Sequence, residues 1–173
     1  MSLLETQNFL ARIYTDENLR CEFLSAPEKI GAKNNLNEKE IIEIIEIFPD
    51  EISAFAESLF WKRLREVEKL LPITRKHLTA EFEKHFRTFA PTYNSQSIKK
   101  HLEDALQFGD YLKNSETVSD FVKNAAKYEC ARLAFHALNK NLVVRFFTFD
   151  LQTGKQKNHL KIWLRIGKRE LVF

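Results

Sequence analysis

Glycine and proline are scarce in this chain, with four of each among its 173 residues. Because turns depend on these two residues, their scarcity argues against a loop-rich or all-β protein and favours long helices joined by short links. The length suits one domain, or a domain with a small appendage, that buries a sizeable core. Phenylalanine is frequent instead, with 15 residues, so we expect a Phe-rich core.

Long apolar runs and an export signal are also missing. No stretch approaches the roughly 18–20 apolar residues that a membrane span requires. The first five residues contain neither a basic leader nor an apolar signal core. Cysteine is limited to Cys21 and Cys130, far apart in sequence, which favours buried or half-buried free thiols over a disulfide. We therefore expect a cytoplasmic protein without a membrane segment.

The motifs of common catalytic and metal sites do not occur. The sequence has no Cys-x-x-Cys or His-Glu-x-x-His spacing, no Glu-x-x-His pair, no glycine-rich phosphate loop and no nucleophile elbow. Glu81 and His85 would share one helix face, either as a solvated polar pair, which we favour, or as a metal or general-base pair. The sequence therefore predicts no catalytic residue, no metal ligand set and no cofactor.

The spacing of apolar residues predicts about seven helices within residues 1–139. Asn37 and Glu40 form a capping-box signature, Pro49 suits the first position of a long helix, and Pro72 ends that helix. Residues 31–35 are expected to form a turn, and Thr74 is expected to cap a helix that continues to Phe89. The helices are expected near residues 3–14, 16–26, 37–45, 49–71, 74–89, 95–112 and 117–135.

Near residue 140 the pattern changes from helix to strand. Residues 142–149 are rich in β-branched and aromatic residues, residues 152–158 are typical of a hairpin loop, and residues 159–166 alternate strictly. A turn at Gly167 then precedes a short strand at residues 170–173. We expect a mainly α (α+β) fold, with a bundle-like helical domain at residues 1–139. A C-terminal antiparallel hairpin or three-stranded sheet at residues 140–173 is expected to pack on it.

The formal charge changes sign at the same place. Residues 140–173 contain eight basic and two acidic residues, a net charge of +6, whereas the whole chain carries +3. The first 139 residues therefore carry −3. A small basic β element on a mildly acidic helical body marks residues 140–173 as the first place to look for a binding site.

The strand at residues 159–166 presents two different faces. Leu160, Ile162, Leu164 and Ile166 form an apolar face, and the opposite face holds the candidate binding residues His159, Lys161, Trp163 and Arg165, with Lys168 nearby. If the apolar face packs on the helices, the indole and its flanking cations are left to contact a partner. The other alternative is that Trp163 packs on a helix and the cations form its solvated rim.

A second basic region lies on the expected long helix. At helical spacing, Trp61, Lys62, Arg65 and Lys69 form a basic stripe with an aromatic side chain inside it, which can follow a nucleic-acid backbone. Glu57, Glu66 and Glu68 interrupt this stripe, so a solvated face of paired charges is the favoured alternative.

Three strings in the sequence resemble a bacterial family without an assigned activity. They are the opening at residues 9–16, the stretch at residues 55–72 that contains Phe55-Ala56-Glu57-Ser58-Leu59, and the ending at residues 162–167. Some members are labelled as DNA-binding, and others resemble partner proteins that help a multinuclear iron enzyme engage a ribosomally made precursor peptide. The opening is also similar to the small helical subunit of ring-opening extradiol dioxygenases. The resemblance implies a helical partner protein and no catalytic residue.

These observations lead to one expected function and one alternative. We expect a non-catalytic binding or adaptor protein that recognises a peptide or protein partner through the C-terminal β element, by its face or by strand addition at its edge. The alternative is nucleic-acid binding through the basic helix stripe or the hairpin face.

Overall fold

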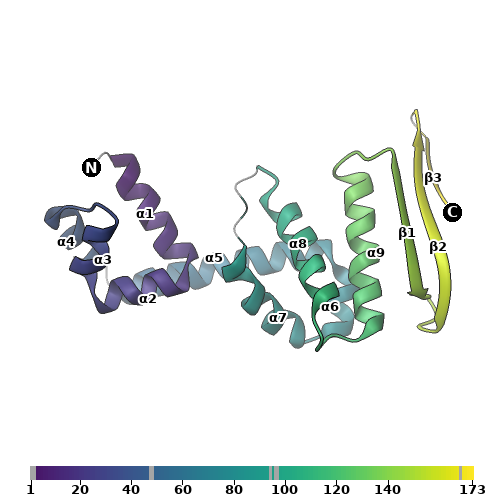
Figure 1. Cartoon of the computed structure of the whole chain (residues 1–173), viewed down its shortest axis with the longest axis horizontal. Coiled ribbons are helices and arrows are strands. Elements are labelled where there is room, and N and C mark those ends of the chain that lie inside the picture. Colours follow the sequence, from purple (N-terminus) through teal and green to yellow (C-terminus); the bar gives the residue numbers. More distant parts are fainter. Residues whose placement is uncertain (1–2, 47–48, 94, 96–97, 168) are drawn as a thin grey trace. The chain divides into compact units, whose positions relative to one another are not determined.

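The computed structural model describes residues 3–46, 49–93, 95, 98–167 and 169–173. Figure 1 shows the helices and strands in chain order. The helices in the described residues are α1 (Leu3–Thr15), α2 (Glu17–Ser25), α3 (Pro27–Lys33), α4 (Glu38–Glu46), α5 (Pro49–Leu70), α6 (Pro72–Leu78), α7 (Glu81–Phe89), the short 3₁₀ helix η1 (Ala90–Thr92), α8 (Lys100–Asn114) and α9 (Asp120–His136). The strands are β1 (Leu142–Phe149), β2 (Gln156–Ile166) and β3 (Arg169–Val172).

The expected fold class is confirmed at the level of a mainly helical chain that ends in a three-stranded antiparallel sheet. The strand order is β1-β2-β3, and both neighbouring pairs are antiparallel. β1 covers the same residues as the expected strand. No helix in the described part of the chain is long and apolar enough to cross a membrane.

The chain divides into two compact units, residues 1–62 and 63–173, with α5 running through the boundary. The expected division at residue 140 does not coincide with this one. β1 packs against α9, so the sheet belongs to the second unit together with α6 to α9. The change of secondary structure near residue 140 is therefore a step within one unit.

The first unit has its own apolar core. Its buried side chains come from α1 to α5 and the turn before α4: Phe9, Ile13, Phe23, Ile30, Leu36, Ile41, Ile44 and Ile52. The capping box that starts α4 is confirmed, because Glu40 N donates to Asn37 Oδ1 at 2.9 Å and Asn37 N donates to Glu40 Oε2 at 2.8 Å. These bonds supply partners for N–H groups that a helix start leaves open.

The second unit is built on the expected phenylalanine core. Phe82, Phe86 and Phe108 are fully buried, and their ring centroids lie 5.1 and 5.2 Å apart in edge-to-face contacts. Where α8 meets α9, a Cβ at Gly109 would lie 2.2 Å from Cys130 Sγ. Glycine at this position therefore lets the two helices approach closely.

Two local differences explain why the described residues contain more than seven α-helices. Residues 27–33 form α3 where a turn was expected at 31–35, because Pro27 starts this helix and Asn35 ends it with a φ of 61°. The expected helix from Thr74 to Phe89 is two helices, α6 and α7, because Thr79 has a φ of 51° and interrupts the helical backbone. Thr74 lies inside the first turn of α6 and does not cap it.

The two cysteines are free, as expected, and differ in exposure. Cys21 is exposed rather than buried, whereas Cys130 is partly buried between α8 and α9. Burial raises the pKa of the Cys130 thiol to about 12, so this thiol stays protonated at neutral pH.

Candidate functional site

The face of the sheet that carries Trp163 packs on α9. Trp163 is 2% exposed and belongs to a cluster with Val143 and Phe147 of β1 and Phe135 of α9. Its ring centroid lies 5.7 Å from that of Tyr128 on α9. The second alternative from the sequence is therefore the one observed, because the indole is part of the core.

The expectation that the apolar face of β2 packs on the helices is wrong. Leu160 is 53% exposed and Ile166 is 60% exposed, while Trp163 between them is buried. The physical reason lies on α9, which presents the aromatic rings of Tyr128 and Phe135. An indole flanked by the aliphatic stems and charged ends of two cationic side chains packs on such rings.

The other candidate residues of β2 accompany Trp163 on this side. Lys161 Nζ lies 4.8 Å from the centroid of the Tyr128 ring, and the Arg165 guanidinium lies 4.8 Å from that of Phe135. Arg165 also forms an ion pair with Glu170 of β3 at 2.6 Å. Trp163 and Arg165 thus hold the sheet to α9 and are not free to bind a partner, and Lys168 lies outside the described residues.

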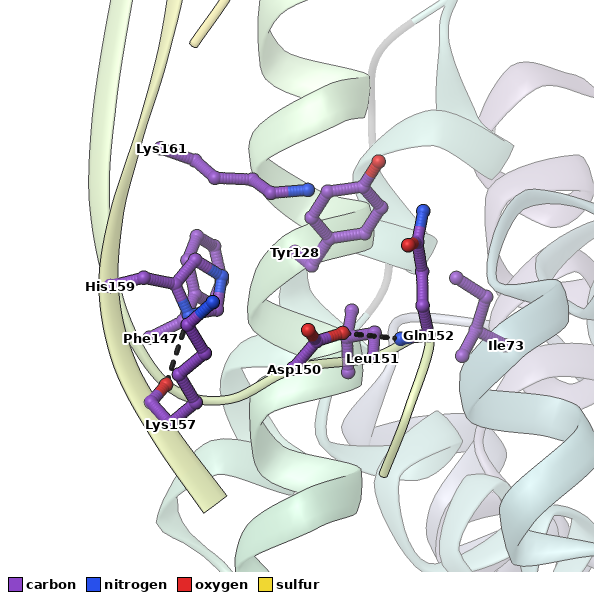
Figure 2. Close-up of a pocket in the computed structure, with 9 residues that line it drawn as sticks. All are labelled: Ile73, Tyr128, Phe147, Asp150, Leu151, Gln152, Lys157, His159 and Lys161. Carbon is purple, nitrogen blue, oxygen red and sulfur yellow. Dashed lines mark hydrogen bonds between the residues drawn. The ribbon is translucent and has the colours of Figure 1, made fainter. Parts of the chain in front are cut away.

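His159 and Lys161 line a pocket between β2, α9 and the start of α6, which we call the β2 pocket. Its volume is about 430 Å³. Figure 2 shows the side chains around it, with the basic groups of β2 on one side and Ile73 and Gln152 on the other. Its lining residues are Ile73, Tyr128, Phe147, Asp150, Leu151, Gln152, Lys157, His159 and Lys161.

The charges of the β2 pocket are unequal. Lys157, His159 and Lys161 occupy alternate positions of β2, whereas Asp150 is the one carboxylate in the described lining. Asp150 Oδ1 accepts hydrogen bonds from Gln152 N at 2.8 Å and Thr153 N at 3.3 Å, as in an Asx turn. These N–H groups hold the pKa of Asp150 below its ordinary value, with a smaller contribution from Lys157. Asp150 is thus committed to the turn.

The opposite side of the sheet, which we call the outer sheet face, is apolar and exposed. Its cross-strand neighbours are Phe146 with Leu160, Val144 with Ile162, and Leu164 with both Leu142 and Leu171. Arg169 is the one charged residue at the described positions of this face on the paired strands. The apolar members of the outer sheet face are Leu142, Val144, Phe146, Leu160, Ile162, Leu164, Ile166, Leu171 and Phe173.

Within the second unit, the helix that packs on the sheet is α9, which lies beside β1 in Figure 1 and contacts the side that carries Trp163. Seven members of the outer sheet face are 39–67% exposed. An apolar patch of this kind on a protein surface often marks a site of contact with another protein.

Three side chains bond to backbone groups on the free edge of β1. Lys127 Nζ of α9 donates to Phe146 O at 2.5 Å, Asn124 Oδ1 accepts from Thr148 N at 2.9 Å, and Arg145 donates to Val144 O at 2.8 Å. These bonds occupy three of the backbone groups on this edge that an added strand would use. The outer sheet face, rather than this edge, is therefore the accessible contact surface of β1.

Sequence reasoning did not identify the outer sheet face, although β1 carries a signal for it. Its sequence Leu142-Val143-Val144-Arg145-Phe146-Phe147 places apolar side chains on both sides of one strand. Strands that are buried on both sides have such near-continuous apolar runs, so this sequence indicates a contact surface on each side of β1. Within the second unit, α9 packs on one of them.

The basic stripe on α5 is partly neutralised. Lys69 forms an ion pair with Glu66 at 2.6 Å, and Trp61 stacks edge-on against Phe60 with centroids 5.7 Å apart. Lys62 and Arg65 are exposed. The alternative of nucleic-acid binding through these residues stays a prediction.

The described residues contain no cluster of three or more His, Cys, Asp or Glu side chains that could hold a metal ion. Glu81 forms an ion pair with Lys84 at 2.5 Å, and the His85 ring lies 6.2 Å from Tyr111. Glu81 and His85 therefore have separate partners on α7 and α8.

Comparison with known proteins identifies no relative from which a function could be inferred. No protein-family model matches the chain, and no curated protein is significantly similar to it. The resemblance to a bacterial family of partner proteins therefore stays a prediction, and the function has to be inferred from the site alone.

Proposed function

We propose that this chain is a non-catalytic binding protein that docks onto another protein through the outer sheet face. The observation that carries the proposal is the patch of nine apolar side chains on one side of the sheet. Their exposure costs free energy in water, at about 25 cal/mol per Å² of apolar surface. A partner that covers the patch recovers this free energy.

The partner that fits this surface is a protein with a complementary apolar face or helix. The patch has one charged residue, Arg169, at its end, so it attracts neither nucleic-acid phosphates nor a highly charged peptide. Phe146 and Leu160 face each other at the end of the patch toward the β1–β2 turn and supply a pair of large anchors.

Site-specific photo-crosslinking in the native host tests this proposal. A photoreactive amino acid is placed at Leu160 or Phe146, and a matched control is placed at Glu116, an exposed position between α8 and α9. We expect one discrete covalent adduct from the two sheet positions and none from Glu116. Mass spectrometry then identifies the crosslinked protein, including a second copy of this chain.

The identified protein is purified and its binary affinity measured by calorimetry. We expect Phe146→Asp to weaken binding about 30-fold, the loss of a hot-spot residue worth about 2 kcal/mol, while circular dichroism shows an intact fold. Adducts that form equally from Glu116, or an unchanged affinity of Phe146→Asp, would contradict the proposal.

A further inference from the structure

The β2 pocket lies on the helix-facing side of the sheet and is independent of the outer sheet face. From its lining we infer that it binds a small organic anion, a carboxylate or phosphate monoester attached to a ring-sized apolar body. The pocket is lined by residues from five parts of the second unit: α6, α9, the strands β1 and β2, and the turn between the strands.

The first argument is the uncompensated positive charge. Lys157 and Lys161 form no ion pair with any carboxylate in the described residues, and Asp150 already accepts two backbone N–H groups. Two lysines and a histidine therefore face one committed carboxylate. An anion in this space would gain charge-assisted hydrogen bonds that the protein itself does not supply.

The second argument is the placement of the nitrogen-bearing side chains. Lys157, His159 and Lys161 project from one strand at a spacing of two residues, so their side chains stand on one side of the sheet. The His159 ring is held by stacking on Phe147 with centroids 5.5 Å apart, and His159 Nδ1 contacts Lys157 O at 3.0 Å. Lys161 Nζ is held above Tyr128. Figure 2 shows these groups around one open space.

The third argument concerns the rest of the ligand. Ile73 and Leu151 add aliphatic surface to the wall, and Tyr128 and Phe147 add aromatic surface. A volume of about 430 Å³ falls in the range of roughly 300–1,000 Å³ typical of small-molecule pockets. A bare inorganic ion would leave the apolar wall in contact with water. A ligand with an apolar ring would cover this wall and should therefore bind more tightly.

Binding is tested by titrating the full chain with phenyl phosphate and, separately, with benzoate, followed by amide NMR shifts and calorimetry. Benzyl alcohol is the neutral control, and inorganic phosphate is the control without a ring. We expect at least one anion to bind with shifts centred on Tyr128 and Gln152, and benzyl alcohol to bind about tenfold more weakly or not at all. The two anions distinguish carboxylate from phosphate recognition.

The variants Lys157→Gln and Lys161→Gln each remove one cation from the pocket. We expect about a tenfold loss of anion affinity in each. Lys155→Gln, in the turn between β1 and β2, should change affinity by less than about twofold, because Lys155 does not line the pocket and its more distant charge is screened by salt. If Lys161→Gln fails to fold after losing its contact with Tyr128, Lys157→Gln still tests the inference.

The inference is overturned if neither anion binds, or if anion affinity is the same in Lys157→Gln and Lys155→Gln. It is also overturned if benzyl alcohol or inorganic phosphate alone binds as tightly as phenyl phosphate and benzoate. None of these results bears on the outer sheet face, which lies on the other side of the strands.

Discussion

At the scale of single residues, β2 reverses the usual amphipathic arrangement of a sheet. Its helix-facing positions carry Lys161, Trp163 and Arg165, and its outward positions carry Leu160, Ile162 and Leu164. The cations do not enter the core as bare charges, because each lies over an aromatic ring of α9 at 4.8 Å. The tryptophan between them is the side chain whose loss should cost most.

We therefore expect Trp163→Ala to lower the free energy of unfolding by about 3–5 kcal/mol, the cost of a large cavity in a packed core. Leu160→Ala, on the same strand but on the outer sheet face, should lower the free energy of unfolding by less than about 1 kcal/mol, as substitutions at exposed positions do. Urea denaturation of both variants measures the two values. Similar losses in both variants would show that Trp163 is not part of the core.

A second residue-scale feature is Glu129 of α9, which is 0% exposed. Its Oε1 accepts from Ile73 N at 2.7 Å, and its Oε2 accepts from Thr74 N at 2.9 Å and Thr74 Oγ1 at 2.7 Å. Glu129 thus caps the start of α6 from a distant helix. Burial raises the pKa of this carboxyl above its ordinary value of 4.5, although these hydrogen bonds oppose the shift.

The raised pKa of Glu129 predicts the sign of a pH effect. The folded state binds the proton on Glu129 more tightly than the unfolded state does. The resulting contribution to the free energy of unfolding is therefore fully present below pH 4.5 and is lost as the pH rises through the pKa of the folded state. In Glu129→Gln this pH dependence of the free energy of unfolding should disappear. The amide group of Gln faces backbone N–H donors with one N–H group of its own, which should lower the free energy of unfolding by about 1–3 kcal/mol. The destabilisation should be largest at acidic pH.

Urea unfolding at several values from pH 4 to pH 8 measures this dependence. Glu116→Gln, at an exposed position, serves as the control and should keep the wild-type pH profile. A wild-type stability that rises with pH through Glu129, so that the variant's deficit grows toward neutral pH, would contradict the assigned direction.

At the scale of elements, the break between α6 and α7 depends on one unusual residue. Thr79 has φ 51° and ψ −121°, a backbone conformation that a β-branched residue adopts only under strain. Its neighbours hold it there, because Arg75 Nη1 donates to Thr79 O at 2.8 Å and Thr79 N donates to Arg75 O at 3.0 Å. The helix therefore ends at Leu78 without glycine.

Because glycine adopts this conformation without strain, we expect Thr79→Gly to stabilise the protein by about 1 kcal/mol, after the entropic cost of glycine is subtracted. Asn35→Gly is the matched control. Asn35 also has a positive φ, 61°, but asparagine tolerates it, so the change should be within about 0.5 kcal/mol. Thermal unfolding compares the two, and a Thr79→Gly variant less stable than Asn35→Gly would refute the expected strain.

At the scale of the whole molecule, the sequence predicts the helices and strands better than it predicts the contacts between distant segments. The mainly helical class, the position of β1, the capping box at Asn37 and the start of α5 at Pro49 follow from local periodicity and helix-end chemistry. The boundary at residues 62 and 63 does not, because it depends on which elements pack together. Local patterns carry no such information.

The candidate site shows the same limit. Alternation in β2 separates the two faces correctly but does not say which one meets α9, because that choice depends on Tyr128 and Phe135 some thirty residues earlier. His159 and Lys161 were identified as candidate residues, and the structure places both in the β2 pocket. Asp150 and Tyr128, which complete that pocket, come from other elements and had no local signal.

The side-chain bonds on the edge of β1 have a consequence for how large an assembly this chain can form. An exposed apolar sheet is a hazard mainly when a free strand edge lets copies add one after another without limit, as in amyloid fibrils. Here Asn124, Lys127 and Arg145 bond to three backbone groups on the edge of β1, so a strand added at this edge would first have to break these bonds. Face-to-face contact instead buries the outer sheet face of both participants, and a symmetric pair formed in this way leaves none of that surface for a further copy.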